Sequence, residues 1–479
     1  MKRMKIKIKP LIVVLLVTFF MIIFSARTAS CFYLLDDKLE VSGFIENWSA
    51  FRLENGHDDL HDGLKAGDYS LCHNTIQVEF EYKMTEELSL KGIWRAWYEG
   101  SLDFNKRMDN LINPHRRDEY THENDMREIY VNFTPGNWRL RAGKQQIVWG
   151  ESDGFRMADI INPLDFSWHY FFPSWEDIRI PLWSADIRYA FPCNIGPFGN
   201  SFVEFVFIPN AFDGGYHPTK LAPAGANWSF PGYPQIFLDW IRNATPEPSL
   251  RASEEGMRVR GVVDGWDLSL FSFYTYTALP VINIKKFNFV DNPFEFKRTM
   301  MVGGTFNKYN DFTQTVFRGE CVARINEPYN TVDLTKILRK ESFAYMLGFD
   351  RPTWIRPLSD RHPFFISGQV FQKFVFNWDK SIGTADMSND GYQTLITLLV
   401  NNSFTWPFLT GTDNVTPQVF GMWDPSGEGW VQPSLSFMVG NYWRGSIGYN
   451  WITARQSDEA YFGQVLDNSE VYFNIRFQW

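Results

Sequence analysis

The last nine residues, Val471–Trp479, alternate between apolar and polar side chains without interruption. Successive side chains of a β-strand point to opposite faces, so this segment is predicted to form a strand with one apolar and one polar face. The apolar face carries Val471, Phe473, Ile475, Phe477 and Trp479, and the polar face carries Tyr472, Asn474, Arg476 and Gln478. Taken alone, the pattern fits either a half-buried strand of a water-soluble protein or a strand whose apolar face meets lipid.

The N-terminus favours export from the cytoplasm. Basic residues between Lys2 and Lys9 precede an apolar run over 11–24, and small residues follow it up to Ser30. This order is typical of a cleaved signal peptide, which we predict over residues 1–30, and the run is shorter than the about 20 residues of a membrane helix. Cys31 leaves a lipoprotein open as an alternative, although Thr28 stands where such a site prefers a Leu-like residue.

An exported chain that ends on an apolar strand with a terminal aromatic residue resembles the bacterial outer-membrane β-barrels. The resemblance implies that Phe477 and Trp479 form an assembly signal for the barrel-assembly machinery. The composition agrees, because a mean hydropathy of −0.27 is that of a water-soluble chain, and barrels span lipid with alternating residues. Aromatic residues make up 17% of the chain, and barrels place them in girdles at both membrane interfaces. The net charge of −9 argues against a nucleic-acid partner.

About eighteen segments of the mature chain, 31–479, have the pattern of strands. The predicted strands cover 39–53, 72–83, 88–99, 125–134, 137–149, 183–191, 200–209, 256–264, 266–277, 298–308, 312–325, 341–350, 363–378, 392–405, 416–423, 429–439, 442–452 and 471–479.

The gaps between these segments alternate between short and long, as the periplasmic turns and outer loops of membrane barrels do. The short gaps are 85–87, 134–137, 264–265, 310–311 and 440–441, and the long ones are 54–69, 100–124, 150–181, 210–255, 278–297, 326–340, 379–391 and 453–468. The sequence therefore predicts an all-β, antiparallel transmembrane barrel of 16–18 strands in a Gram-negative outer membrane, with both termini periplasmic. Two gaps are exceptions to this alternation: 406–415 is long for a periplasmic turn, and 424–428 is short for an outer loop. A barrel of sixteen strands therefore remains an alternative. The alternative, a secreted multi-sheet protein, does not predict the alternation.

One segment, Leu140–Gly154 and its continuation to Asp165, carries a motif. It resembles the porin-like outer-membrane barrels of domain-of-unknown-function family 1302, whose signature is a strand ending in "GRQ…WGES" followed by an "NP" turn. The matching residues are Gly143, Gln145, Trp149, Gly150, Glu151, Ser152, Asn162 and Pro163, with Lys144 where the family often has Arg. The resemblance implies a barrel with a transport-linked role, in a family without a settled biochemical function.

The gap that follows the motif, 150–181, mixes charged residues with aromatic ones that would otherwise face water. We therefore expect it to fold into the lumen and narrow the channel, selecting solutes by charge and size. The alternative is an external cap without solute contact. Lys144 falls on the apparent lipid face, a conflict that a position at the rim or a β-bulge would remove. The predicted pore residues are Arg141, Lys144, Gln145, Trp149, Glu151, Asp153, Arg156, Asp165, Asp177 and Arg179.

Other chemistry has less support. No Ser pairs with His73 as a nucleophile, so no enzymatic activity is predicted, and the four scattered cysteines predict neither a disulfide nor a metal site. The acidic loop from His57 to Asp68 is interpreted as solvated rather than as a cation site, and no cofactor is predicted. The leading function is passive passage of small solutes. The alternatives are a conduit for hydrophobic or lipid-like compounds that works with periplasmic and inner-membrane export partners, and a scaffold barrel for another protein.

Overall fold

The protein is a closed antiparallel barrel of eighteen strands. The computed structural model describes residues 32–479 except 57–63, 105–116, 170–173, 223–225, 229–234, 287–291, 383–390, 407–412 and 456–461, so the predicted signal peptide lies outside the described residues. The main sheet contains twenty strands, of which the short β1 (Phe32–Leu34) and β20 (Phe404–Thr405) only extend the edges of β2 and β21. Each of the other eighteen pairs with the next in the chain, and β24 pairs with β2 to close the ring.

The barrel strands agree with the predicted segments in number and order. They are β2 (Leu39–Arg52), β3 (Tyr69–Lys83), β4 (Leu88–Glu99), β5 (His122–Phe133), β6 (Trp138–Gln145), β8 (Leu182–Ala190), β9 (Gly199–Ile208), β11 (Glu254–Val263), β12 (Trp266–Tyr276), β15 (Arg298–Asn310), β16 (Thr315–Asn330), β17 (Ile337–Thr353), β18 (Phe364–Val375), β19 (Tyr392–Asn401), β21 (Asn414–Asp424), β22 (Glu428–Val439), β23 (Trp443–Thr453) and β24 (Glu470–Gln478). The predicted fold class is confirmed at the upper end of its range.

The remaining elements are short and lie in the connections. They are β7 (Asp165–Phe166) paired with β10 (Lys220–Leu221), β13 (Val281–Ile282) paired with β14 (Phe294–Glu295), α2 (Ser101–Phe104), α4 (Arg117–Thr121), α5 (Trp175–Ile178), α6 (Gln235–Asn243), and the 3₁₀ turns η1 (Leu250–Ala252), η2 (Ile284–Lys286) and η3 (Gly463–Asn468). No helix in the described ranges has both the length and the apolarity needed to cross a bilayer.

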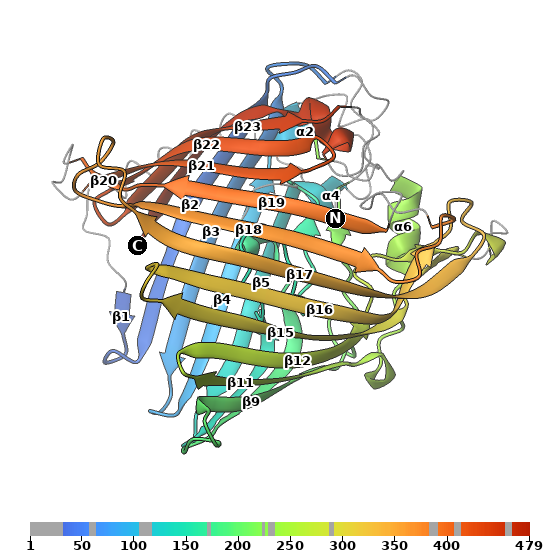
Figure 1. The fold of residues 1–479 in the computed structure, drawn as a ribbon, viewed down its shortest axis with the longest axis horizontal. Coiled ribbons are helices and arrows are strands. Elements are labelled where there is room, and N and C mark those ends of the chain that lie inside the picture. The colour runs from blue at the N-terminus through green and yellow to red at the C-terminus, as the bar shows by residue number, and fades with distance from the viewer. Residues whose placement is uncertain are drawn as a thin grey trace, which may run out of the picture.

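The two ends of the barrel differ. Helices α2, α4 and α6 gather at one end, which we call the loop end, and the C-terminus and β1 lie at the other, the turn end (Figure 1). The two expected exceptions are present: connection 402–413 at the turn end is long, and connection 425–427 at the loop end is short. The predicted gap 326–340 was too long, because β16 and β17 continue their pairing to Asn330 and Ile337. The predicted strand 137–149 was also too long, because β6 ends at Gln145.

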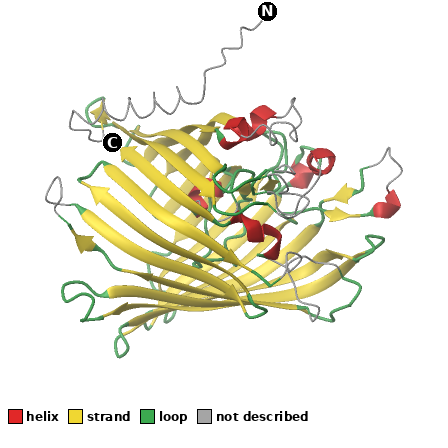
Figure 2. Ribbon diagram, turned by 90° about the horizontal axis from the view of Figure 1, so that it is seen from above, coloured by secondary structure: helices red, strands yellow, loops and turns green. Residues whose placement is uncertain are grey.

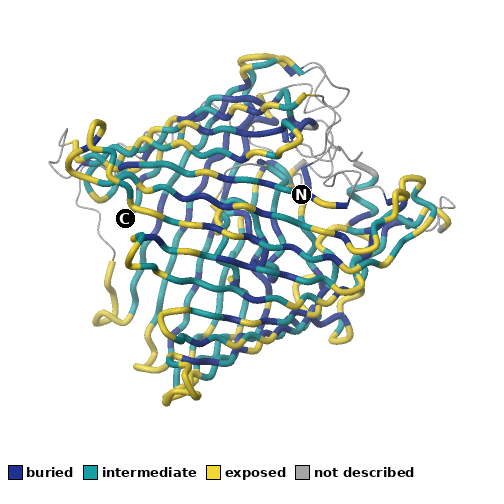
Figure 3. The backbone as a smooth tube through the Cα atoms, in the orientation of Figure 1, coloured by how far each residue is buried: buried dark blue, intermediate teal, exposed yellow. Residues whose placement is uncertain are grey.

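The alternation of the last strand has the expected consequence for β24. Asn474 and Arg476 both donate to the Glu46 carboxylate on the lumen side, whereas Phe473 and Ile475 are exposed on the outside. Phe477 departs from the expectation of a lipid-exposed face: it is buried, because Trp443 of the neighbouring strand packs against it. The same alternation of exposed and covered positions runs along the other strands (Figure 3).

The apolar core lies inside the barrel. Loops and helices gather within the curved wall of strands at the loop end (Figure 2). Two buried clusters join inward side chains of the wall to residues of the connection between β6 and β8, which we call loop 146–181. Of the cysteines, Cys72, Cys193 and Cys321 are free thiols, and Cys31 lies outside the described residues.

Candidate functional site: a loop that crosses the barrel

The motif residues close the base of loop 146–181. The Asn162 side chain accepts a hydrogen bond from the Ile147 N–H at 2.8 Å and donates to the Ile180 carbonyl at 2.9 Å, so one amide holds the start and the end of the loop together. Gly150 is needed for close approach, since a Cβ atom there would lie 2.7 Å from the Asp159 nitrogen. The motif therefore builds the root from which the loop enters the lumen.

Trp149 fixes this root to the wall. Its indole N–H donates to the Glu204 carboxylate of β9 at 3.0 Å, and its ring packs against Phe271 and Phe273 of β12. The Arg258 guanidinium lies 5.5 Å from the ring centroid. A buried indole with a satisfied N–H supplies both apolar contact and orientation. The Trp149 side chain is 1% exposed, so it acts on the loop and does not touch solute.

Beyond the root, the loop docks on β16 through main-chain hydrogen bonds. The buried Glu320 carboxylate accepts from the N–H groups of Glu151 and Ala158. Arg318 donates to the Glu151 carbonyl at 2.6 Å and to the Asp153 carboxylate at 2.5 Å. Because these bonds hold the backbone of the loop, they fix its path across the barrel.

The next residues of the loop pack on an apolar inner wall formed by β17–β23. Phe155 meets the Phe371 ring of β18 edge to face at 6.0 Å, and Met157 is buried among wall residues. Gly154 lies so close to β19 that a Cβ atom would be 2.7 Å from the Thr397 methyl carbon. We call this contact the apolar anchor. Its buried wall residues are Ala344, Met346, Phe371, Leu395, Met422, Trp430 and Ile452.

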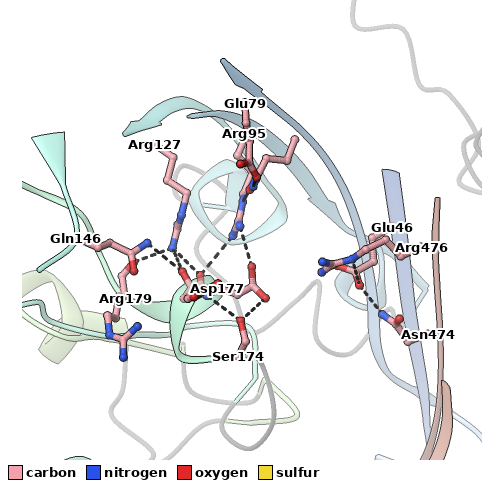
Figure 4. A network of polar contacts seen from close by, with 12 residues as sticks. Glu46, Glu79, Arg95, Arg127, Gln146, Ser174, Asp177, Arg179, Asn474 and Arg476 are labelled. Atoms are coloured by element: carbon pink, nitrogen blue, oxygen red, sulfur yellow. Dashed lines mark hydrogen bonds and ion pairs between the residues drawn. The ribbon is translucent and has the colours of Figure 1, made fainter. Parts of the chain in front are cut away.

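The end of the loop docks on the opposite wall through charge. Asp177 of α5 forms an ion pair with Arg95 of β4 at 2.7 Å, and Arg127 of β5 donates to the carbonyls of Glu176, Asp177 and Arg179 (Figure 4). We call this contact the charged anchor. Burial tends to raise the pKa of Asp177, but Arg95 and the Ser174 hydroxyl outweigh it and hold that pKa below its usual value.

A third contact joins the middle of the loop to β3 and β24. The Trp168 ring stacks on His73 at 4.2 Å, and His169 Nε2 lies 3.0 Å from the Glu470 carboxylate. Both partners of the His169–Glu470 pair are almost completely buried. Loop 146–181 thus contacts strands on every side of the interior: β16 to β19, β24 and β3 to β5.

A cavity of about 1470 Å³, which we call the vestibule, lies beneath the charged anchor. It extends from α5 to the turn end of the barrel, where Gly43 and Trp479 line it. Two ion pairs lie on its wall: Arg476 binds both oxygens of Glu46, and Arg95 binds Asp177 (Figure 4). Cations and anions that face each other across a cavity create a local electric field within it.

The predicted pore residues fall into three places. Asp177 and Arg179 line the vestibule, and Glu151 and Asp153 lie at the β16 docking site. Gln145 and Trp149 are buried in the wall, Arg156 is bound to Asp159 within the loop, and Asp165 pairs with Lys220. Arg141 lies over the Tyr130 ring, and Lys144 bridges two carboxylates at the loop-side end of β6. The β5–β6 ladder ends at Lys144, and the β6–β8 register passes it without a shift, so its setting is a rim position and not a bulge.

Other vestibule residues were not among the predicted pore residues. Glu46 and Arg476 pair across the seam that closes the barrel, between the first and last barrel strands, so no local pattern brings them together. Arg95 and Arg127 occupy inward positions of predicted strands. They differ from other charged residues that face the lumen because α5 docks on them. The signal that could have found all four is their inward parity on strands that the sequence does predict.

A closed barrel with an inward loop above a charged vestibule defines the class of porin-like outer-membrane barrels. Residues 52–479 match the family described as "Protein of unknown function (DUF1302)", and the chain belongs to that family. No curated protein shows significant similarity to the chain.

Solved structures to which the chain is similar have low sequence identity to it. The outer membrane protein opdK from Pseudomonas aeruginosa is 8% identical over 93% of this chain and 100% of its own, with a TM-score of 0.45. OccAB2 of Acinetobacter baumannii is 11% identical over 92% and 98%, with a TM-score of 0.45. The outer membrane channel DcaP of the same organism is 11% identical over 94% and 100%, with a TM-score of 0.41. The assignment of residue roles here depends on this chain's own contacts.

Proposed function

We propose that the protein is an outer-membrane channel for passive passage of small solutes, narrowed by the loop predicted at 150–181, with both termini on the periplasmic side. The observation that supports it most is the charged anchor, where Asp177, Arg95 and Arg127 meet at the ceiling of the vestibule. Charged groups at the narrowest part of a water-filled barrel influence which ions pass and how fast. Membrane lipid surrounds the outer face, and no chemical step is part of the proposal.

The first test is planar-bilayer conductance of the purified protein carrying Asp177→Ala and Arg179→Ala together. Both side chains line the vestibule, so we expect a changed ion preference, measured as a shifted reversal potential in a salt gradient. A second variant, Glu151→Ala with Asp153→Ala, removes carboxylates at the β16 docking site and is expected to give larger or noisier conductance steps. A control variant changes the exposed charges Asp333 and Asp379. Wild-type selectivity and step size in both test variants would refute the constriction.

The conduit for hydrophobic or lipid-like compounds stays a second candidate because of one observation. The inner wall of β17–β23 is apolar where Phe155 and Met157 dock, which is unusual for a lumen that only has to hold water. Displacement of the loop from this wall would uncover an apolar track. The third candidate, a scaffold for another protein, has no comparable support, because the protein's own loop occupies the interior.

A further inference from the structure

We propose that the barrel wall contains a side portal between β5 and the start of loop 146–181. Through it, a lipid-like amphiphile with an apolar chain and a polar head passes between the vestibule and the membrane. This inference deepens the proposed channel function and rests on it, because it takes the vestibule to be a space that holds solute. Its evidence is separate and comes from the pairing of the wall strands.

The wall is incomplete beside β5. The β4–β5 ladder follows the whole of β5, from His122 to Phe133, but the β5–β6 ladder covers only Ile129–Phe133. Above that level the neighbouring strands are missing, because the chain turns inward after Gln145 and returns at Leu182. The gap beside residues 122–128 of β5 is called the notch.

Among the residues that the structure describes, no strand pairs with the edge of β5 that faces the notch. Alternate N–H and C=O groups of a strand point to opposite sides, so about half of those in residues 122–128 point away from β4. In the described part of the chain, no backbone hydrogen bond joins these residues to a segment other than β4. An open ladder edge is not tolerated in hydrocarbon unless protein or water covers it. The notch is therefore a place where lipid alone does not seal the wall.

Side chains cross the notch where no ladder does. Arg127 donates to carbonyls of loop 146–181, the Gln146 N–H donates to the Glu128 carboxylate, and two lysines form ion pairs. Lys144 of β6 lies opposite Trp183 of β8. Its Nζ is 2.5 Å from a carboxylate oxygen of Asp125 in β5 and 3.7 Å from one of Asp213 in the loop after β9. Lys220 of β10 lies 3.7 Å from Glu123 of β5. Partly exposed pairs of this kind are far weaker than a hydrogen-bonded ladder. We call Lys144 and Lys220 the latch.

The vestibule reaches the inner side of the notch. Arg127 and Glu128 of β5 line the vestibule, and so do Gln146 and Val148 on the facing edge. Val148 is 44% exposed, although it lies at the root of a loop that is otherwise packed into the barrel. An apolar side chain exposed inside a cavity, next to charged groups, is suited to a molecule with both kinds of surface.

The outer side of the notch faces lipid. Trp94 of β4 alternates with Arg95, which lines the vestibule, so Trp94 points outward. Its register partner is Met126, and Trp183 is exposed on the other flank. Outward Trp residues mark the interface between headgroups and acyl chains. A molecule in the notch thus meets apolar surface on the outside and charged groups on the inside. These two surfaces match the apolar chain and the polar head of an amphiphile.

The test is photo-crosslinking to lipid in vesicles of phosphatidylethanolamine and phosphatidylglycerol. The crosslinker p-benzoylphenylalanine is incorporated in place of Val148, in place of the lipid-exposed Leu270, or in place of Met438 on the vestibule wall away from the notch. Lipid adducts are measured by mass spectrometry. We expect adducts at positions 270 and 148 and none at 438, with the yield at 148 rising several-fold in a Lys144→Gln/Lys220→Gln variant.

The matched control for the latch is Lys91→Gln. Lys91 pairs with Glu81 across the β3–β4 ladder, which is complete, so its loss is expected to leave the yield at position 148 unchanged. Absence of adducts at 148 with and without the latch, while 270 is labelled, would overturn the portal. Equal labelling at 438 would also overturn it, because lipid would then enter by the turn end.

Conductance of the same preparations separates the two proposals. Conducting protein without an adduct at position 148 refutes the portal and leaves the channel. An adduct at 148 that depends on the latch, in protein without conductance, refutes the passive channel and leaves the portal.

Discussion

The two sides of the barrel interior that hold loop 146–181 use different physics. The apolar anchor buries Met157 and packs Phe155 on the wall of β17–β23, whereas the charged anchor holds α5 by one ion pair and three hydrogen bonds from Arg127. Apolar packing depends on buried area and does not involve a titrating group. The Arg95–Asp177 ion pair depends on protonation, and of the two anchors only the charged one faces the vestibule. We infer that the apolar anchor retains the loop in the barrel, while the charged anchor sets the ion selectivity of the channel.

The largest expected effect comes from breaking the apolar anchor with Met157→Ala. Met157 is 3% exposed, so its truncation leaves a cavity and is expected to cost the docked state about 2–5 kcal/mol. Limited proteolysis of the folded barrel should then cut loop 146–181 faster, and conductance steps should become larger or unstable. The matched control is Phe312→Ala, which removes a large apolar side chain that is 96% exposed at the turn end. A loop as resistant to protease as in the wild type would show that the apolar anchor is dispensable.

A smaller effect is expected from breaking the charged anchor with Asp177→Asn. The side chains of Arg95 and Asp177 are 10% and 21% exposed, and a hydrogen bond to a charged group in such a setting is worth about 1.5–3 kcal/mol. The Arg127 bonds to main-chain carbonyls persist, so the loop should stay docked, with wild-type resistance to protease. The shift should appear in ion selectivity, since Arg95 loses its counter-charge. Protease sensitivity equal to that of Met157→Ala would erase the distinction between the anchors.

The contrast also shows where sequence reasoning succeeds. Alternation predicted the strands, and the order of short and long gaps predicted the barrel, because both follow from the two-residue period of a strand and from turns that must be tight. The charge and aromatic content of 150–181 gave reason to expect an inward loop. The partners of its charges were out of reach: Asp177 meets Arg95 from β4, and Asp153 meets Arg318 from β16, far apart in sequence. Such pairs depend on the path of the loop, which carries no periodic signal.

The notch illustrates the same limit. Lys144 contradicted the expected lipid face, and the sequence allowed either a rim or a bulge. The strand had been predicted to continue to 149, so the early end of β6 at Gln145, which makes Lys144 a rim residue, was missed. An apolar continuation through Ile147 and Val148 has strand propensity, and the buried docking of Trp149 overrides it.

The smallest expected effect is a difference in how docking at the two ends of the loop depends on pH. Burial raises the pKa of Glu151 at the β16 site, whereas Arg95 and Ser174, acting against burial, lower that of Asp177. A carboxyl with a raised pKa binds protons more tightly when docked, so its contribution to docking is full below the ordinary value of 4.5 and declines as the pH rises through the raised one. Asp177 behaves in the opposite way: its contribution is present above the ordinary value of 3.8 and is lost only as the pH falls through the lowered one.

Acidification from pH 7 towards 4.5 should therefore steady the loop at the Glu151 end and leave the Asp177 end unchanged, which predicts quieter conductance. As the pH falls below 3.8 towards the lowered pKa of Asp177, the charged anchor should weaken and the noise should return. Glu151→Gln is expected to remove the first change and Asp177→Asn the second, so the two variants separate two titrations in one loop. If acidification to pH 4.5 makes conductance noisier in the wild-type protein and Glu151→Gln does not alter that response, the assignment of the raised pKa to the β16 docking site is wrong.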